Sequence, residues 1–329
     1  MATRRSARRP IGRESARDGF VYHFRGRTIT DPRELERIES LAIPPAWQQV
    51  EIARSPKAKV LAVGIDAAGR RQAIYNPSFR RRRDRQKFAR MIDFGEALPE
   101  LRARVDKDLA SRRLSKAKAV ACVVKLLDEE NFRVGNRQYS RRHGSYGVTT
   151  LRREHVRVTR SRIYFDYTGK SAKHHQHSLP DPRLARAVGR LLELPGEAVF
   201  KYRTRSGRIN EVTSKHINAY IKKHAGSRFS AKDFRTWGAT RLAVEFMRST
   251  PVAEKDEAYA AHMVAFVADR LGNTPAVARG SYIHPVMLQL AEAQDGPAQV
   301  ADAGRKRRAR KRFSVAEQCA LQLLGEHST

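Results

Sequence analysis

The sequence predicts an α+β fold, with a small β-rich N-terminal domain and a larger, mainly α-helical domain that contains one short β-hairpin. Two observations lead to this prediction. Alternation of apolar and polar residues, which is typical of strands, is concentrated in the first 85 residues. From residue 86 onward, apolar residues mostly recur at the three- and four-residue spacing of helices. A chain of 329 residues is long enough for two domains.

The N-terminal elements are short and are bounded by turn residues. Residues 20–24 alternate as a strand does, and residues 60–66 and 71–75 predict a hairpin across an Ala-Ala-Gly-Arg turn. Between them, Asp31 and Pro32 predict the start of a short helix. Asp is a favoured N-cap, and Pro is tolerated at the first helical position.

The helical part follows a strongly basic run at residues 80–85, which we take as the boundary between the domains. One hairpin interrupts the helices, with residues 163–167 as its clearest strand and residues 168–171 as its turn. Further on, Ser314 and Glu317 have the spacing of a capping box and predict a final short helix. The other predicted helices span residues 98–109, 117–128, 181–194, 214–224, 236–247 and 257–271.

The charge of the chain predicts a polyanionic partner. Lys and Arg number 66 against 34 Asp and Glu, which gives a formal net charge of +32. The basic residues are spread over the whole length, and such an excess destabilises a compact fold by self-repulsion unless a polyanion is close by. We therefore expect nucleic acid as the partner in preference to an anionic membrane surface. No run of 18 apolar residues occurs, so we expect no membrane-spanning segment.

Four potential phosphate-binding side chains and one phenol form the candidate catalytic set. Cationic donors stabilise the charge that develops on phosphate oxygens when a phosphodiester is cleaved, and a phenol can accept the phosphoryl group. Such chemistry needs no metal and no nucleotide cofactor. The sequence also has no Gly-x-x-x-x-Gly-Lys-[Ser/Thr] phosphate loop, so we expect no use of ATP. In chain order, the five residues are Arg133, Lys170, Arg235, Asn273 and Tyr282.

The segments around these residues resemble type IB DNA topoisomerases of the compact bacterial and poxvirus kind. The resemblance runs from about residue 20 to residue 292 and keeps the order of the family's motifs. The matching segments are Ile43-Pro-Pro-Ala-Trp47, Gly69-Arg-Arg-Gln-Ala-Ile-Tyr75, Asn131-Phe-Arg-Val-Gly-Asn136 with Tyr146-Gly-Val-Thr-Thr-Leu151, Phe165-Asp-Tyr-Thr-Gly-Lys170, and the stretches around Arg235 and Tyr282.

This resemblance implies a role for each residue of the catalytic set. Tyr282 is expected to be the nucleophile, forming a 3′-phosphotyrosyl link and releasing a 5′-hydroxyl. Arg133 and Arg235 are expected to hold the scissile phosphate. Lys170, in the tip of the hairpin, is expected to be the general acid for the 5′ oxygen. Asn273 stands where some members of the family carry histidine, and it can donate a hydrogen bond to the phosphate but adds no charge.

The resemblance also implies a set of DNA contacts, and the residue pattern along the chain gives a domain plan. The expected DNA-binding residues are Arg71, Gln72, Tyr75, Tyr139 and Lys232. Residues 1–18 are expected to form a basic disordered arm, residues 19–85 a β-rich DNA-binding domain, residues 86–294 a mainly helical catalytic domain, and residues 295–329 a basic C-terminal tail with a short helix. Together these parts predict a monomer that clamps duplex DNA in the cytoplasm, associated with the nucleoid.

The expected function is relaxation of supercoiled duplex DNA by nicking, strand rotation and religation, but two alternatives remain. The first is a tyrosine site-specific recombinase, which usually carries His-x-x-Arg where this chain has Lys232-Asp-Phe-Arg235. The second is a non-enzymatic basic DNA-binding protein, which leaves the ordered catalytic set unexplained. The run His174–His177 lacks neighbouring Cys or carboxylate residues at ligand spacing, so it predicts DNA-backbone contact or plain exposure and no metal site.

Overall fold

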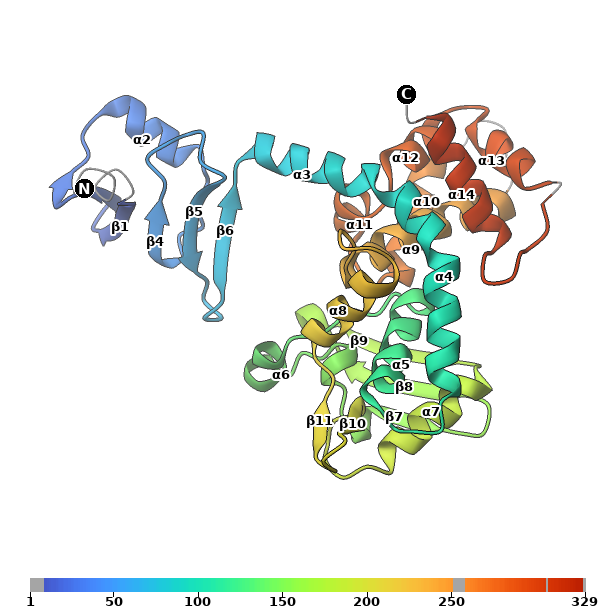
Figure 1. The fold of residues 1–329 in the computed structure, drawn as a ribbon. Coiled ribbons are helices and arrows are strands. Elements are labelled where there is room, and N and C mark those ends of the chain that lie inside the picture. Colours follow the sequence, from blue (N-terminus) through green and yellow to red (C-terminus); the bar gives the residue numbers. More distant parts are fainter. Residues whose placement is uncertain (1–8, 251–257, 306, 328–329) are drawn as a thin grey trace. The chain divides into compact units, whose positions relative to one another are not determined.

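The structure is a computed structural model that describes residues 9–250, 258–305 and 307–327 (Figure 1). The chain divides into two compact units, Met1–Gln86 and Lys87–Thr329. Each unit has its own apolar core, and each is described by itself below.

The described residues of the first unit form a six-stranded antiparallel sheet, one complete helix and most of a second. The strand order is β3-β2-β1-β4-β5-β6. Helix α2 (Pro32–Glu39) starts at Asp31, whose side chain accepts a hydrogen bond from the backbone of Arg33, so the predicted N-cap is confirmed. The strands are β1 (Ile11–Ala16), β2 (Gly19–Phe24), β3 (Arg27–Thr28), β4 (Gln48–Ile52), β5 (Val60–Ile65) and β6 (Arg71–Tyr75).

The predicted hairpin of this unit is confirmed, and the predicted N-terminal arm is too long. Strands β5 and β6 pair in antiparallel register, with Ile65 opposite Arg71. Residues 11–16, expected to be disordered, form β1 because Ile11 fills the core beside Ile52. Residues 1–8 of the expected arm lie outside the described residues.

The basic run at residues 80–85, which we take as the boundary between the domains, lies inside helix α3 (Pro77–Ala89). This helix carries the chain from the first unit into the second. Its last turn contributes Lys87 and Phe88 to the second unit, where Lys87 is buried.

The second unit is mainly helical and is organised around two buried helices, α5 and α9. Nearly every side chain of the first half of α9 is buried, including Phe234 and Trp237, which is expected of a helix enclosed by others. Gly95 allows α4 to approach Trp237, since an added Cβ would lie 2.3 Å from its ring. The helices are α4 (Met91–Ala110), α5 (Lys116–Glu129), α6 (Arg137–His143), α7 (Pro182–Leu192), α8 (Ser214–His224), α9 (Ala231–Ser249), α10 (Tyr259–Arg270), α11 (Pro275–Ser281), α12 (Pro285–Glu292), α13 (Gly296–Arg305) and α14 (Val315–Glu326).

Two small sheets complete this unit. The predicted hairpin at residues 163–167 is present, but it belongs to a three-stranded sheet of order β7-β8-β9. Its strands are β7 (Val156–Val158), β8 (Ile163–Thr168) and β9 (His174–Leu179), and a short 3₁₀ turn, η3 (Lys170–Ala172), forms the tip. The second sheet pairs β10 (Lys201–Arg203) with β11 (Ile209–Glu211).

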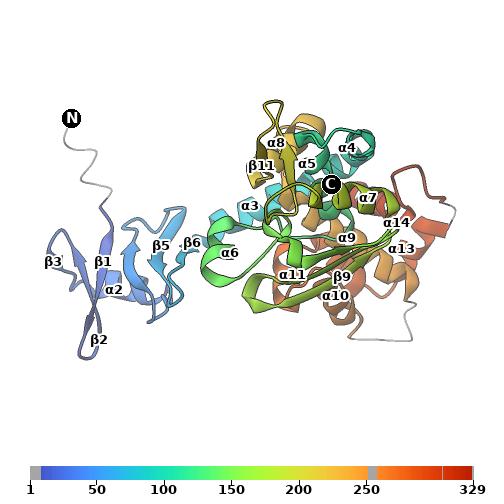
Figure 2. The same ribbon diagram turned by 90° about the horizontal axis from the view of Figure 1, so that it is seen from below.

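The residues expected to form a basic tail are part of the helical core. Helices α13 and α14 pack against α9, and they lie beside one another in both views (Figures 1 and 2). The capping box of Ser314 and Glu317 is confirmed at the start of α14. The Glu317 carboxylate also accepts hydrogen bonds from Trp237 and Arg102, so this segment is anchored to α9 and α4. The prediction of a tail was wrong because the basic composition of residues 304–312 outweighed the apolar residues of α13 and α14 in the sequence pattern.

Candidate active site

Arg133 and Asn273 lie in contact although they are far apart in the sequence. Arg133 Nη2 donates to the carbonyl oxygen of Gly272 at 3.0 Å and to Oδ1 of Asn273. Arg133 belongs to the loop after α5, and Asn273 belongs to the loop between α10 and α11. The arginine therefore orients the Asn273 amide, leaving Nδ2 as the group that can donate.

The loop that carries Arg133 is fixed by a close approach of two glycines. An added Cβ on Gly147 would lie 2.5 Å from the backbone nitrogen of Gly135. The backbone N–H of Val148 donates to the carbonyl of Arg133 at 2.8 Å. Any larger residue at position 147 would push apart the two backbone segments that contain Gly135 and Gly147. This close approach gives a physical reason for both glycines in the matching motif.

Arg235 is the most deeply buried cation of the set, with 5% of its surface exposed on the second turn of α9. Its Nη1 donates to the carbonyl of Asn131, and its Nη2 donates to the carbonyl of Leu271 at 2.8 Å. Arg235 thus joins the Arg133 loop to the loop that precedes Asn273. Its position and direction are set by backbone atoms, as expected for a donor that must be preorganised.

Two donors at this place are buried and have no hydrogen-bond acceptor among the described residues. They are Nε of Arg235 and Nδ2 of Asn273. A buried donor without a partner costs about 1–3 kcal/mol, and more for a charged group. An anionic ligand at this place would remove that cost, so the pair fits a phosphate oxygen better than it fits a purely structural role.

Tyr282 ends helix α11 beside these groups. The guanidinium carbon of Arg235 lies 5.0 Å from the centre of its ring. Burial raises the pKa of Tyr282, but the charge of Arg235, with Lys232 and Arg133, outweighs burial and holds the pKa below the ordinary value of 10.0. The phenol is therefore easier to deprotonate than a free tyrosine, which suits a nucleophile.

Lys170 is the one residue of the catalytic set that the structure does not bring into contact with the others. It lies in the exposed tip between β8 and β9. In residues 9–250, 258–305 and 307–327, no hydrogen bond or ion pair joins it to Arg133, Arg235, Asn273 or Tyr282.

The residues expected to contact DNA are mostly exposed. Tyr75 on β6 is 51% exposed and Tyr139 on α6 is 42% exposed, which is unusual for aromatic side chains. Arg71 and Lys232 are also exposed. Gln72 is held by Asp66, to which its amide donates at 2.8 Å. The aromatic rings are thus available for ligand contact, and their role in DNA binding remains a prediction.

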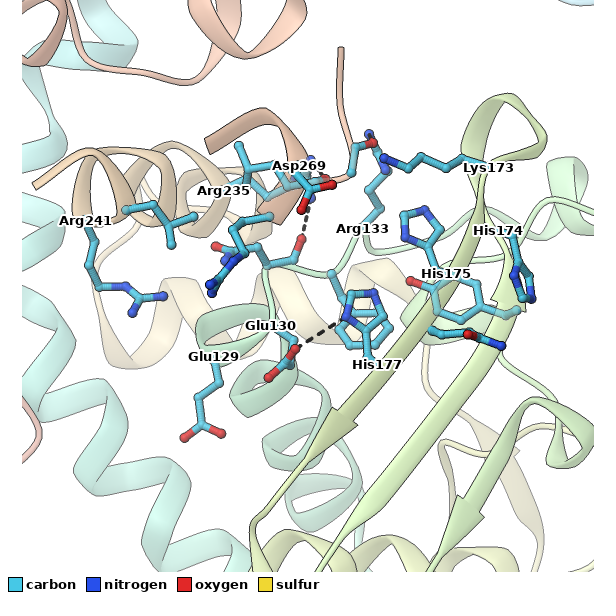
Figure 3. A pocket seen from close by; sticks show the side chains of 18 of the residues that line it. Glu129, Glu130, Arg133, Lys173, His174, His175, His177, Arg235, Arg241 and Asp269 are labelled. Carbon is cyan, nitrogen blue, oxygen red and sulfur yellow. Dashed lines mark hydrogen bonds and ion pairs between the residues drawn. The ribbon is translucent and has the colours of Figure 1, made fainter. Parts of the chain in front are cut away.

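A cavity of about 420 Å³ adjoins the candidate catalytic residues and is lined also by residues outside that set (Figure 3). Arg133, Arg235, Tyr167, His175 and His177 are among the residues that line it. The histidine run is therefore not simply exposed, because His175 and His177 are half-buried. The period of two along β9 was the signal that could have found them. The part of the chain that the structure describes contains no cluster of three potential metal ligands.

Comparison with known proteins gives the family. Residues 76–302 match the family described as eukaryotic DNA topoisomerase I, catalytic core, and residues 19–66 match the bacterial DNA topoisomerase IB N-terminal domain. The chain is 31% identical over 291 residues to the DNA topoisomerase 1B of Acanthamoeba polyphaga mimivirus, covering 85% of this chain and 87% of that protein. It is 20% identical over 239 residues to the DNA topoisomerase 1B of Vaccinia virus strain Copenhagen, covering 70% and 72%.

A solved structure of the XerH site-specific recombinase bound to its difH substrate also aligns, with 15% identity and a TM-score of 0.36, over 56% of this chain and 48% of the other. That score is too low to define a shared fold. The two family matches together cover most of both units, and the mimivirus relative is similar along nearly its whole length. The chain therefore belongs to the type IB DNA topoisomerases, a family of isomerases.

Proposed function

We propose that this protein relaxes supercoiled duplex DNA without ATP or metal, by cutting one strand through Tyr282, allowing the free end to rotate, and resealing the strand. The observation that carries this proposal is the pair of buried, unpaired donors, Arg235 Nε and Asn273 Nδ2, beside a tyrosine of lowered pKa. A scissile phosphate would accept from both donors. It would thereby come next to the phenol oxygen.

The proposed cleavage step is a transesterification. Tyr282 loses its proton to solvent, and its oxygen forms a bond to phosphorus. The bond from phosphorus to the 5′ oxygen breaks, and that oxygen takes a proton from Lys170. Arg133 and Arg235 neutralise the charge on the non-bridging oxygens, each contributing about 10²–10³-fold to the rate. A general acid contributes about 10²–10⁴-fold.

Religation is the reverse of this step. The phosphotyrosyl ester keeps the energy of the broken phosphodiester, and the 5′-hydroxyl attacks it once the strand has rotated. A phenolate with a lowered pKa is a good leaving group in this direction. The same group therefore serves both halves of the cycle, and no external energy source is needed.

We further propose that the protein acts as a monomer on duplex DNA and is associated with the nucleoid in the cytoplasm. The net charge of +32 supports a DNA partner, as do the exposed Tyr75, Tyr139, Arg71 and Lys232. Among the described helices, none is long and apolar enough to cross a membrane.

The test is relaxation of a negatively supercoiled plasmid in excess EDTA without ATP, with the wild type compared with Tyr282→Phe. The wild type should relax the plasmid, and Tyr282→Phe should bind it without relaxing it. Binding without relaxation by both proteins would favour the recombinase or the architectural alternative. Relaxation by both would place the nucleophile elsewhere.

A further inference from the structure

His175 lies between the two loops that carry Lys170 and Asn273. Gly169 directly precedes Lys170, and an added Cβ on this glycine would lie 2.6 Å from Cδ2 of His175. Gly272 directly precedes Asn273, and an added Cβ there would lie 2.5 Å from Cε1 of the same ring. The imidazole thus lies against both backbones, and both contacts require glycine.

The ring of His175 is held in place by its aromatic neighbours. It stacks on Tyr167, with 5.1 Å between centroids and 18° between planes, and on His177, at 5.7 Å and 13°. Tyr167 in turn stacks on Phe132, the residue before Arg133, at 5.7 Å. Through these stacked rings, His175 is connected to the loop that carries Arg133 as well as to the hairpin. Figure 3 shows His175 and His177 on the side of the cavity that also holds Arg133.

The imidazole is uncharged at neutral pH. Burial, together with the nearby His177, Arg133, Lys173 and Arg235, lowers the pKa of His175 to about 4. A neutral ring can lie beside Arg133 without repelling it, whereas a third cation at this place could not. The side chain is thus suited to packing and is not suited to binding phosphate by charge.

Few hydrogen bonds within the described residues hold the hairpin tip. Lys170, Ser171 and Ala172 are exposed, and the backbone of Ser171 and Ala172 has positive φ values of 63° and 55°. One hydrogen bond closes the tip, from the N–H of Gly169 to the carbonyl of Lys173 at 2.8 Å. The tip is therefore a compact unit whose place depends on the contact between Gly169 and His175, while a hydrogen bond of 2.8 Å from the N–H of Tyr146 to the carbonyl of Thr168 holds the end of β8.

We propose that His175 is a positioning residue for the general acid: it holds the tip of the β8–β9 hairpin against the Gly272–Asn273 loop, so that Lys170 can reach the 5′ oxygen of the scissile phosphate. This inference rests on the proposed function. It assigns His175 no proton transfer of its own, and the proton moves from Lys170 to the 5′ oxygen as that oxygen leaves phosphorus.

The test uses single-turnover cleavage of two DNA substrates that differ only in the 5′-bridging atom, oxygen or sulfur. A thiolate leaves without a proton, so the sulfur substrate does not need Lys170. A misplacement of about 1 Å can cost about 10²-fold in rate, and His175→Ala should lose this much on the oxygen substrate. On the sulfur substrate it should remain within a fewfold of the wild type. Lys170→Ala should show the same pattern, and the double variant should be no slower than Lys170→Ala.

Two further variants make the test specific. His174→Ala alters the neighbouring exposed histidine, which pairs with Asp166, and should leave the ratio of the oxygen and sulfur rates as it is in the wild type. His175→Gln has an amide that reaches the Nε2 position and keeps part of the contact with Gly169. Its rate on the oxygen substrate should fall between those of the wild type and His175→Ala.

Three results would overturn the inference. An equal loss on both substrates by His175→Ala would mean that the residue supports the phosphate site and not the acid. An unchanged rate on the oxygen substrate would mean that the contact does not matter. If Lys170→Ala itself failed to recover on sulfur while the wild type cleaved normally, the acid would be another group, and the inference would fall with that assignment. A wild type that cleaves neither substrate would instead refute the proposed function.

Discussion

Lys87 Nζ donates a hydrogen bond of 2.8 Å to the backbone carbonyl of Ser281, the residue before Tyr282. On the other side of the tyrosine, His284 contacts the ring of Phe88, with centroids 5.1 Å apart. The last turn of α3 therefore holds both flanks of the proposed nucleophile. The orientation of the phenol depends on this helix as well as on Arg235.

Removal of this hydrogen bond is expected to slow cleavage more than it weakens DNA binding. Lys87→Met keeps the length of the buried side chain but leaves the Ser281 carbonyl without this donor, so the turn before Tyr282 can shift. We expect about a tenfold or greater fall in single-turnover cleavage, since orientation errors of this kind are costly. Arg85→Met, which removes an exposed cation from the same helix, is the matched control. Equal rates for the two variants would contradict the role given to Lys87.

Asn273 is expected to act through its amide nitrogen. Asn273→Ala removes the unpaired Nδ2 donor and should reduce cleavage by about 10²–10³-fold. Asn273→Asp should reduce the cleavage rate further, because its carboxylate would pair with the Arg133 guanidinium and repel the phosphate. Asn273→His should retain activity, since an imidazole can donate to the same oxygen. Cleavage rates on one duplex substrate would rank the three variants, and an Asp variant as active as wild type would exclude contact with the phosphate.

Replacement of Arg235 should alter the pH dependence of cleavage. The charge of Arg235 is the largest influence that lowers the pKa of Tyr282, so weakening this contact should raise that pKa. Deprotonation would then need a higher pH, and the rising limb of the rate–pH profile should move to higher pH in Arg235→Lys. Lysine also lacks the fork that grips the carbonyls of Asn131 and Leu271. Arg241→Lys, on the same helix, should leave the profile where it is in the wild type.

Two histidines should make the fold sensitive to mild acid. Burial lowers the pKa of both His175 and His284 to about 4 in the folded protein, against an ordinary value of 6.5. The unfolded chain therefore binds these protons first as the pH falls. The free energy of unfolding should therefore decrease as the pH falls from about 6.5 to about 4. Above pH 6.5, the full stabilisation from these two uncharged histidines should be present.

His284→Asn provides the check on that pH dependence. The His284 ring caps α12 by accepting from the N–H of Val286, and asparagine can accept the same hydrogen bond. Urea unfolding at several pH values between 4.5 and 7 should give a smaller loss of stability for the variant than for the wild type. A parallel pH dependence in the two proteins would contradict the assignment to His284.

The carboxylate of Glu317 should matter for stability and not for chemistry. It is buried and bonded to Arg102 and to the indole of Trp237. Removal of one partner from a buried pair typically costs about 3–5 kcal/mol. Glu317→Gln should therefore lower the urea midpoint substantially, while the cleavage rate of the folded protein at low temperature stays close to that of the wild type. A slowed cleavage step with unchanged stability would contradict this assignment.

The sequence predicted those elements of secondary structure that depend on residues close together in the chain. The β5–β6 hairpin, the cap at Asp31 and the capping box at Ser314 all follow from patterns a few residues long, and all three are present. The structure also brings Arg133, Arg235, Asn273 and Tyr282 to one place, as their motifs required, although their catalytic roles stay predictions.

What the sequence missed depends on long-range packing. Strand β7 has three residues, too few for a periodic signal, and exists because it pairs with β8. Helix α13 consists mainly of small residues, and its place is set by the buried Pro297 and Val300. The sequence predicts DNA-backbone contact or plain exposure for His175, because nothing local in the chain shows that Gly169 and Gly272 make room for its ring.

The anchoring of α14 has a consequence for folding during synthesis. Trp237 and Arg102 receive Glu317 as their partner only after residue 317 has been added, although every residue of the proposed catalytic set has been synthesised by then. Until that point, the helix that carries Arg235 lacks part of its packing. A growing or proteolytically shortened chain that stops before α14 therefore contains every residue of the proposed catalytic set but lacks the partner that Trp237 and Arg102 have in the full fold.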